Sequence, residues 1–433
     1  MKVTTVVIAG AGGRGRLTYA PYSKQFPDEM KLVAAAEKIP ERLREIQREY
    51  ALSEEHCFSS VEEMFARPRL ADMAFICTQD KDHVRHACLA LEKGYELLLE
   101  KPVSDDVAEC RRLLQKAEEL GRSVTVCHVL RYAPFYQKLK KLLEEGAVGR
   151  IISIQASENV GYWHQAHSFV RGNWRNSGET SPMILQKCCH DMDLLVWLTG
   201  SRCERISSMG SRSYFREENA PQGAPRYCLE GCPVKEDCPY DAEKIYVTDK
   251  VTGYDAKGAG WLQNAVMVKP TREGLLDVLR TSPYGRCVFR CDNDVVDNQS
   301  ITLEMENGVT VGFHMCGLNR NNYRSIHIMG TRGDITGNLE EEELVLHRFG
   351  GEEETLRIDA AETASGHSGG DFCMLHDMFE ARDQGRAALT NLRQSLESHY
   401  MALAAEQSRR SGGKRILLEE FVNENGSIRN MVE

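Results

Sequence analysis

A glycine-rich turn near the N-terminus has the residue types and spacing that bind a dinucleotide. An apolar run, residues 3–9, leads directly into Gly10, Gly12 and Gly15, which are spaced G-x-G-x-x-G. Gly10 permits a tight turn, Gly12 lets the backbone approach a pyrophosphate, and Gly15 lets the following helix pack against the strand. The free N–H groups at the start of that helix would then face the phosphates. We expect two further residues of the turn at the same cofactor site: Gly13 and Arg14.

An acidic residue follows the second apolar run and suggests which dinucleotide binds. Residues 31–36 predict a second strand, and Glu37 ends it, 27 residues after Gly10. A carboxylate in this place accepts hydrogen bonds from the adenosine ribose diol and would repel a 2′-phosphate. The sequence therefore predicts NAD, with NADP a weaker ligand because Lys38 and Arg42 soften the repulsion. The alternative interpretation is a glycine turn of structural use only, with Glu37 as a solvated surface residue.

Lys101 is the first candidate for proton transfer. It stands in a Glu-Lys-Pro triplet, residues 100–102, that ends the apolar run 97–99. Ligands of doubly wound sheets sit beyond the carboxyl ends of the strands, and desolvation there favours a neutral amine that can accept a proton. The alternative is a solvated charge or an ion pair with the preceding glutamate. The same edge of the sheet should carry further cofactor contacts from Thr78, His83 and Glu100.

His190 is the second candidate for the chemical step. On a helix, Lys187, His190 and Asp191 share a face through their i, i+3 and i+4 spacing. An imidazole titrates near neutrality, so it can take or relay a substrate proton. The alternative is a histidine whose hydrogen bonds are satisfied inside an interface between domains.

The elements that must position these residues fall into two parts of the 433-residue chain. Strand and helix signals alternate through about the first 125 residues, which predicts a parallel Rossmann sheet with helices on both faces. Alternating runs flank Asn307-Gly308 and predict a hairpin of an antiparallel sheet. We therefore expect an α/β dinucleotide-binding domain, residues 1–128, and an α+β substrate domain, residues 129–433. The second domain carries an irregular Cys-rich insertion at about residues 203–265.

Composition excludes several classes of protein. The net charge is −10 without a basic run, which argues against a nucleic-acid surface, and no segment is long and apolar enough to predict a membrane span. The first strand begins at residue 3, so we expect no leader peptide, and the 15 cysteines then indicate a reducing cytoplasm. An open sheet in the second domain suggests a homo-oligomer.

Three cysteines of the insertion raise the question of a metal. Cys228, Cys232 and Cys238 are spaced C-x3-C-x5-C, which fits no common zinc or iron–sulfur pattern. Zinc with a fourth ligand from elsewhere and reduced or locally paired thiols both remain open. We predict a structural insertion and assign no metal ligand.

The chain resembles the Gfo/Idh/MocA oxidoreductase family over nearly its whole length. The resemblance rests on GAGGRG at residues 10–15, EKP at residues 100–102 and QKCCHDMDLL at residues 186–195. It implies oxidation of a ring secondary alcohol of a sugar or glycoside by hydride transfer to NAD or NADP, with Lys101 and His190 as catalytic residues. Many members carry an aspartate four residues before the histidine. Gln186, which cannot act as a base, stands there instead, so Lys101 and His190 are the main candidates for proton transfer.

A sugar needs an aromatic face for its C–H surfaces and fixed donors for its hydroxyls, so we expect a sugar site lined by polar and aromatic residues; the alternative is that these side chains serve packing. The candidates are Arg131, Tyr132, His167, Arg171, Trp174, Gln186 and Lys187. The segment 167–174 and the Cys-rich insertion look like a glycoside-directed subset of the family. One alternative is therefore an NAD-dependent glycosidase that works by transient oxidation, elimination, hydration and re-reduction. Another is a non-catalytic dinucleotide-binding regulator, which the presence of both Lys101 and His190 disfavours.

Overall fold

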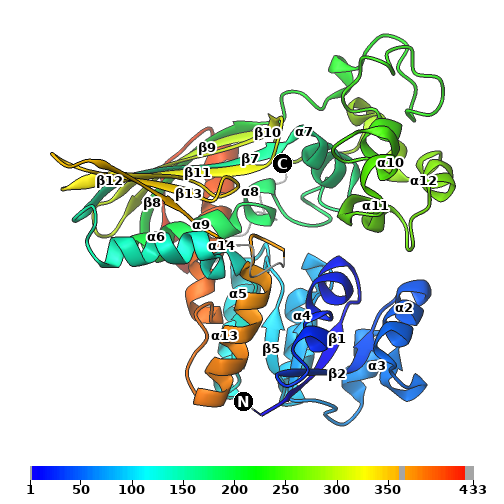
Figure 1. Cartoon of the computed structure of the whole chain (residues 1–433), viewed down its shortest axis with the longest axis horizontal. Helices are drawn as coiled ribbons and strands as arrows, with labels where there is room; N and C mark the ends of the chain where they lie inside the picture. Colours follow the sequence, from blue (N-terminus) through cyan, green and yellow to red (C-terminus); the bar gives the residue numbers. More distant parts are fainter. Residues whose placement is uncertain (1, 360–365, 425–433) are drawn as a thin grey trace.

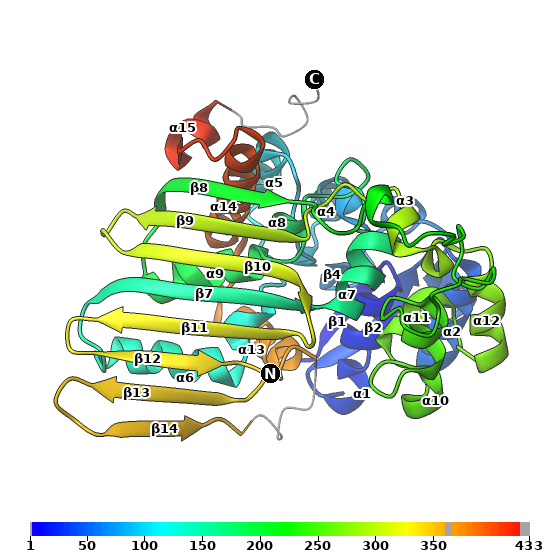
Figure 2. The ribbon, with the colours of Figure 1, turned by 90° about the horizontal axis from the view of Figure 1, so that it is seen from above.

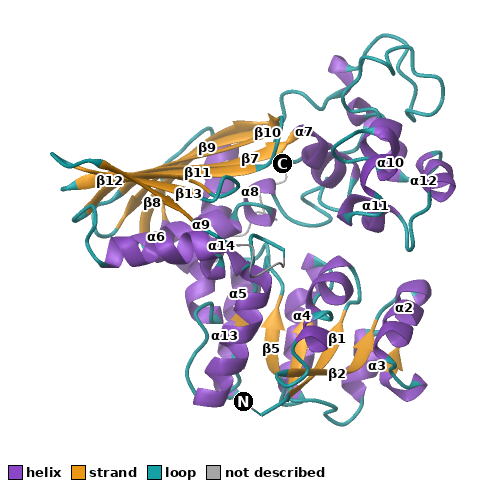
Figure 3. Ribbon diagram, in the orientation of Figure 1, coloured by secondary structure: helices purple, strands orange, loops and turns teal. Residues whose placement is uncertain are grey.

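The computed structural model describes residues 2–359 and 366–424, which form two sheet-based domains (Figure 1). Figure 3 shows that helices flank the smaller sheet, whereas the larger sheet has an open face. Over the described ranges, no helix is long and apolar enough to cross a membrane.

The first domain is a six-stranded parallel sheet in the order β3-β2-β1-β4-β5-β6, as in a Rossmann fold. Its central strand β1 is buried on both faces because alternating helices cover them. The strands are β1 (Thr4–Ala9), β2 (Met30–Ala36), β3 (Cys57–Phe58), β4 (Met73–Ile76), β5 (Glu96–Leu99) and β6 (Val124–Val126). The helices are the π-helical η1 (Gly13–Tyr19), α1 (Tyr22–Gln25), α2 (Pro40–Tyr50), α3 (Val61–Ala66), α4 (His83–Glu92) and α5 (Val107–Glu119).

The second domain is built on a nine-stranded sheet in the order β14-β13-β12-β11-β7-β10-β9-β8-β15. All its neighbouring strands are antiparallel except β7 and β10, and the predicted hairpin at residues 307–308 joins β9 to β10. The strands are β7 (Ile151–Gly161), β8 (Cys203–Ser211), β9 (Asn298–Met305), β10 (Thr310–Asn319), β11 (Tyr323–Gly330), β12 (Gly333–Asn338), β13 (Glu343–Arg348), β14 (Glu353–Arg357) and β15 (Ile416–Leu417). The predicted fold class is confirmed.

Helices cover one face of this second sheet, and the other face is open in Figure 2. The chain then returns to the first domain, where Met374 and Phe379 share a core with Ile8 of β1. The helices of this part are α6 (Pro134–Glu144), α8 (Met183–Gln186), α9 (Cys189–Thr199), α13 (Gly370–Gln384), α14 (Leu392–Arg410) and α15 (Leu418–Asn423).

The irregular region is longer than the predicted 203–265. Residues 203–211 form β8 inside the sheet, so the region starts after that strand and continues to Asp297, before β9. It contains α10 (Tyr254–Lys257), α11 (Trp261–Val266) and α12 (Arg272–Leu279), and it packs against α7 (Tyr162–His164) at the end of β7. Figures 1 and 2 both place these helices beside the first domain, next to α2.

Candidate active site

The glycine turn has the shape that a pyrophosphate needs. Gly10 has a φ of +97°, and a Cβ there would lie 2.6 Å from the carbonyl oxygen of Cys77. A Cβ on Gly15 would lie 2.1 Å from the carbonyl oxygen of Gly10, so helix η1 approaches the turn as closely as a hydrogen atom allows. A Cβ on Gly13 would meet no atom within 4 Å, so that side of the loop is open. The residues present therefore fit a dinucleotide phosphate.

Glu37 stands at the carboxyl end of β2, as predicted. Its carboxylate is buried, and one oxygen accepts a hydrogen bond from the backbone N–H of Ile39 at 2.9 Å. That bond holds the carboxylate at the strand tip. The other oxygen has no partner in the described residues and suits a ribose hydroxyl.

Arg14 joins the glycine turn to the end of β5 and to α13. Its guanidinium lies 2.5 Å from the Glu100 carboxylate and 2.6 Å from the Asp371 carboxylate, and it donates to the hydroxyl of Tyr19. Burial raises the pKa of the Glu100 carboxyl, but the charge and hydrogen bond of Arg14, the hydrogen bond from Tyr19 and the charge of Lys101 together keep this pKa below its usual value. Arg14 and Glu100 thus connect the glycine turn to the carboxyl end of β5.

Lys101 bridges the two domains. Its Nζ donates a hydrogen bond of 2.7 Å to the main-chain carbonyl of Gln186 in α8. The ring of His83 supports the same turn, with its nitrogens 2.7 Å from the carbonyl oxygen of Pro102 and 3.0 Å from that of Thr78. The predicted residues of this edge therefore come together at the carboxyl ends of β4 and β5.

His190 lies in the first turn of α9, and its Nδ1 is buried without a hydrogen-bond partner. Its ring is 5.8 Å from the rings of both His128 and His367. Burial, and next the charge of Lys101, hold the pKa of His190 well below its usual range. The imidazole is therefore neutral near pH 7.

Asp80 is a carboxylate of this site that the sequence analysis missed. It follows β4, is buried, and accepts a hydrogen bond from the Ser181 hydroxyl at 3.3 Å. With the Gln186 amide in the orientation that satisfies its neighbours, its nitrogen donates to Asp80 at 2.8 Å and its oxygen accepts from the indole of Trp174 at 2.6 Å. Burial raises the pKa of Asp80, and the charges of His83 and Lys101 oppose that rise. Its place after a strand of the parallel sheet was the signal available in the sequence.

A second buried charge cluster lies beside Lys187. The Lys187 ammonium is 3.3 Å from the Glu158 carboxylate, and Arg324 pairs with Glu158 at 2.7 Å and with Asp191 at 2.9 Å. Burial raises the pKa of Asp191 to about 6 although Arg324 lies against it. Glu158 and Arg324 come from neighbouring strands β7 and β11, a pairing that no sequence motif indicated.

Four predicted sugar-binding residues make hydrogen bonds within the protein. Arg131 makes two hydrogen bonds to Asp193, at 2.6 and 2.7 Å, and the Tyr132 hydroxyl bonds Thr390. Arg171 donates to the carbonyls of Arg286 and Tyr240, and His167 bonds the hydroxyl of Tyr246 at 2.9 Å. We therefore place Arg131 and Arg171 in the supporting structure. Trp174, Gln186 and Lys187 lie at the site.

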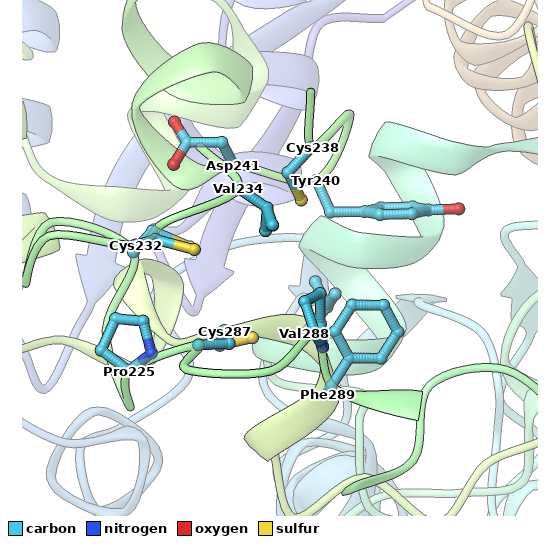
Figure 4. Close-up of a pocket in the computed structure, with 12 residues that line it drawn as sticks. Pro225, Cys232, Val234, Cys238, Tyr240, Asp241, Cys287, Val288 and Phe289 are labelled. Carbon is cyan, nitrogen blue, oxygen red and sulfur yellow. The ribbon is translucent and has the colours of Figure 1, made fainter. Parts of the chain in front are cut away.

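The cysteines of the insertion line a pocket away from Lys101. Cys228, Cys232 and Cys238 are joined there by Cys287, with Phe289 on the same wall (Figure 4). Every cysteine of the chain is free. In residues 2–359 and 366–424, no group of three or more His, Cys, Asp or Glu side chains is arranged to hold a metal ion.

The two-domain fold and the glycine turn at the carboxyl edge of the parallel sheet are those of an NAD-binding oxidoreductase. A family model described as oxidoreductase family, NAD-binding Rossmann fold, matches residues 4–128. The companion model, oxidoreductase family, C-terminal alpha/beta domain, matches residues 140–417. The chain therefore belongs to the Gfo/Idh/MocA oxidoreductase family, and the resemblance predicted from its motifs is confirmed.

Curated relatives include an oxidoreductase, an inositol dehydrogenase and a glycosyl hydrolase. The chain is 23% identical to oxidoreductase YteT of Bacillus subtilis (strain 168) over 397 residues, 87% of this chain and 89% of that protein. It is 27% identical over 182 residues to an inositol 2-dehydrogenase of Corynebacterium glutamicum (strain R), 41% of this chain and 45% of that protein. It is also 27% identical over 227 residues to glycosyl hydrolase family 109 protein 2 of Phocaeicola vulgatus, 48% of this chain and 54% of that protein. The chain thus spans about half the length of these last two relatives.

A solved structure with the same fold is an oxidoreductase from Agrobacterium radiobacter, crystallised with NAD+, L-tartaric acid and magnesium. It has a TM-score of 0.69 and 14% identity, over 96% of this chain and 99% of that one. The predicted cofactor class, a nicotinamide dinucleotide on a Rossmann domain, is confirmed.

Proposed function

We propose that this protein oxidises a ring secondary alcohol of a sugar or glycoside, with NAD as hydride acceptor. One observation carries the proposal: Lys101 Nζ meets the Gln186 carbonyl where the two domains join, beside the dinucleotide loop. The neutral imidazole of His190 lies near the same lysine side chain. A proton acceptor is therefore placed next to the cofactor edge, which a binding-only regulator does not need.

Residues of the first domain would hold the cofactor. The glycine turn would bind the pyrophosphate, Glu37 the adenosine ribose, and Thr78 and His83 the segment nearer the nicotinamide. The nicotinamide, when bound, supplies the hydride acceptor. The ion pair between Arg14 and Glu100 fixes the glycine turn relative to Lys101.

The side chains around Lys101 handle the hydroxyl proton. Lys101, in its neutral amine form, exchanges its bond with the Gln186 carbonyl for one with the substrate hydroxyl and accepts the hydroxyl proton, becoming an ammonium, as the carbon is oxidised. His190 bonds the same hydroxyl or passes the proton on. Asp80 compensates the charge that develops on Lys101, taking the part of the aspartate absent at Gln186. Lys187 and Trp174 contact the sugar from the second domain.

The similarity to a family 109 glycosyl hydrolase favours a second candidate, redox-neutral cleavage of a glycoside. A ring ketone acidifies the neighbouring C–H, and Lys101 or His190 could then remove that proton and expel the aglycone. The same residues serve both reactions, so product analysis must separate them. We further propose a cytoplasmic location and a homo-oligomer formed through the open face of the second sheet.

The test begins with mass spectrometry for copurified NAD, followed by a panel of free sugars and aryl glycosides. NADH formed with an intact glycoside supports the dehydrogenase, and aglycone release without net NADH supports the glycosidase. Lys101→Ala should lower turnover by about 10²-fold or more with NAD affinity retained. The matched control is Lys93→Ala, an exposed lysine of the same domain. Near-normal turnover by Lys101→Ala, or activity only on non-carbohydrate alcohols, would refute the proposal.

A further inference from the structure

The insertion carries a group of aromatic side chains that the proposed reaction does not use. Trp261 begins α11, and its indole lies 4.9 Å from the ring of His167, 5.1 Å from that of His164 and 6.0 Å from that of Trp163. Tyr284 stacks on His167 from another side at 5.1 Å and an interplanar angle of 19°. We call these five residues the aromatic wall.

The histidines of the aromatic wall are fixed by hydrogen bonds, whereas Trp261 is exposed. His167 is 2% exposed and hydrogen-bonded to the Tyr246 hydroxyl at 2.9 Å. His164 is held by Asn322, whose Oδ1 lies 3.0 Å from its Nδ1. Trp261 is 49% exposed, although it is one of the largest apolar side chains of the protein. An exposed indole can stack on the flat apolar face of a ligand, and the neighbouring histidine rings can form hydrogen bonds with hydroxyl groups around the edge of that ligand.

The position of the wall relates it to the active site. His164 lies close enough to Lys187 for that charge to add to burial in lowering the pKa of the His164 imidazole. Lys187 directly follows Gln186, the residue whose carbonyl accepts from Lys101. On its other side, α11 contacts helix η1 of the dinucleotide loop. The exposed indole therefore packs on His164, on the side of Lys187, and its helix α11 contacts the cofactor loop.

An ion pair fixes the insertion to the first domain in this position. Lys269, just after α11, lies 2.8 Å from the Glu45 carboxylate of α2. The Lys269 hydrogen bond lowers the pKa of the Glu45 carboxyl. This ion pair holds the segment that carries Trp261 against α2 of the first domain.

We propose that Trp261, backed by Trp163 and His164, is a subsite for a second pyranose ring, next to the sugar that is oxidised. The inference rests on the proposed function and narrows its substrate class to glycosides in which one sugar is linked to another. The C–H face of the second ring would stack on the indole. Its hydroxyls would face His164 and Lys187. A free monosaccharide would leave the indole uncovered.

The experiment compares two substrates with the same oxidised ring, a disaccharide and its methyl glycoside, in NAD-loaded enzyme. Trp261→Ala should raise KM for the disaccharide about 10-fold with little change in kcat, and change KM for the methyl glycoside less than about twofold. Trp261→Phe should restore most of the difference because it keeps an aromatic face. Phe349→Ala, at an aromatic residue that is 67% exposed in the turn after β13, is the matched control.

Three outcomes would overturn the subsite: an equal effect on both substrates, no effect on either, or a loss of NAD affinity in Trp261→Ala. The last would mean that the indole contacts the dinucleotide. Preference for an aryl glycoside over the disaccharide, lost in the variant, would assign the wall to an aromatic aglycone and also overturn the pyranose assignment. If the wild type turns over no sugar, the proposed function fails. Calorimetric binding of the disaccharide to wild type and Trp261→Ala then decides the subsite separately.

Discussion

Buried histidines should make the stability of this protein fall steeply between pH 7 and pH 5. Burial lowers the pKa of His86 to about 4 and those of His167 and His399 to about 3. The unfolded chain, with a histidine pKa of about 6.5, binds these protons first as the pH falls. Each group therefore stabilises the fold fully only above its unfolded pKa, and the contribution decreases toward its folded pKa.

The size of the effect follows from the same values. One such histidine costs about 2 kcal/mol of unfolding free energy at pH 5 and about 0.2 kcal/mol at pH 7. The three together lower stability by about 5 to 6 kcal/mol over this range. Asp191 acts in the opposite direction, because burial raises its pKa to about 6 and its folded form holds the proton more tightly.

His167→Phe isolates one of these groups. Phenylalanine keeps the ring contacts with Trp261 and Tyr284 but loses the bond to Tyr246, which costs stability equally at every pH. In urea unfolding from pH 5 to 7, the unfolding free energy of the variant should change less with pH than that of the wild type. Near pH 5 the slope should be smaller by about 1.4 kcal/mol per pH unit, which corresponds to about one proton. The control Tyr284→Phe changes the same cluster without removing a group that titrates in this range. An unchanged slope in His167→Phe would refute the reasoning.

Three further changes test the site. Glu37→Ser should raise the affinity for NADP relative to NAD by about 10-fold or more, because it removes the charge that repels a 2′-phosphate; wild-type protein that binds NADP as tightly as NAD would contradict this. Arg131→Met should lower the unfolding free energy by about 3–5 kcal/mol, because it leaves the buried Asp193 carboxylate without its partner; a loss below about 1 kcal/mol would count against it. Asp80→Asn should lower turnover by about 10-fold to 10²-fold at unchanged NAD affinity, since it removes the carboxylate beside Lys101; full activity would exclude that role.

Some predicted residues were placed correctly because neighbours in sequence determine their positions. Gly10 must adopt a positive φ and Gly15 must pack on the preceding turn, whatever the rest of the fold does. Lys101 follows a buried strand, and parallel strands bring their carboxyl ends to one edge. Local rules were therefore enough to place the cofactor loop, Glu37 and Lys101.

Other side chains could not be assigned from their types alone. Arg131 and Arg171 looked like sugar ligands, but each is buried with acceptors 62 to 115 residues away, which the chain pattern does not reveal. Trp261 lay in a region that gave only an irregular composition. Its contacts with α7 depend on how the insertion folds back onto the end of β7.

The sequence by itself determined the fold class, the dinucleotide loop and the place of Lys101 at the end of β5, because these depend on hydrophobic periodicity, glycine conformation and strand order over short stretches. Only the tertiary structure decided which polar groups complete the site. Asp80 from the first domain reaches Ser181 and Gln186 of the second, and Glu158 and Asp191 share Arg324 across strands and helix. Such pairings come from burying charged groups that must find partners in three dimensions, and sequence separation does not constrain them.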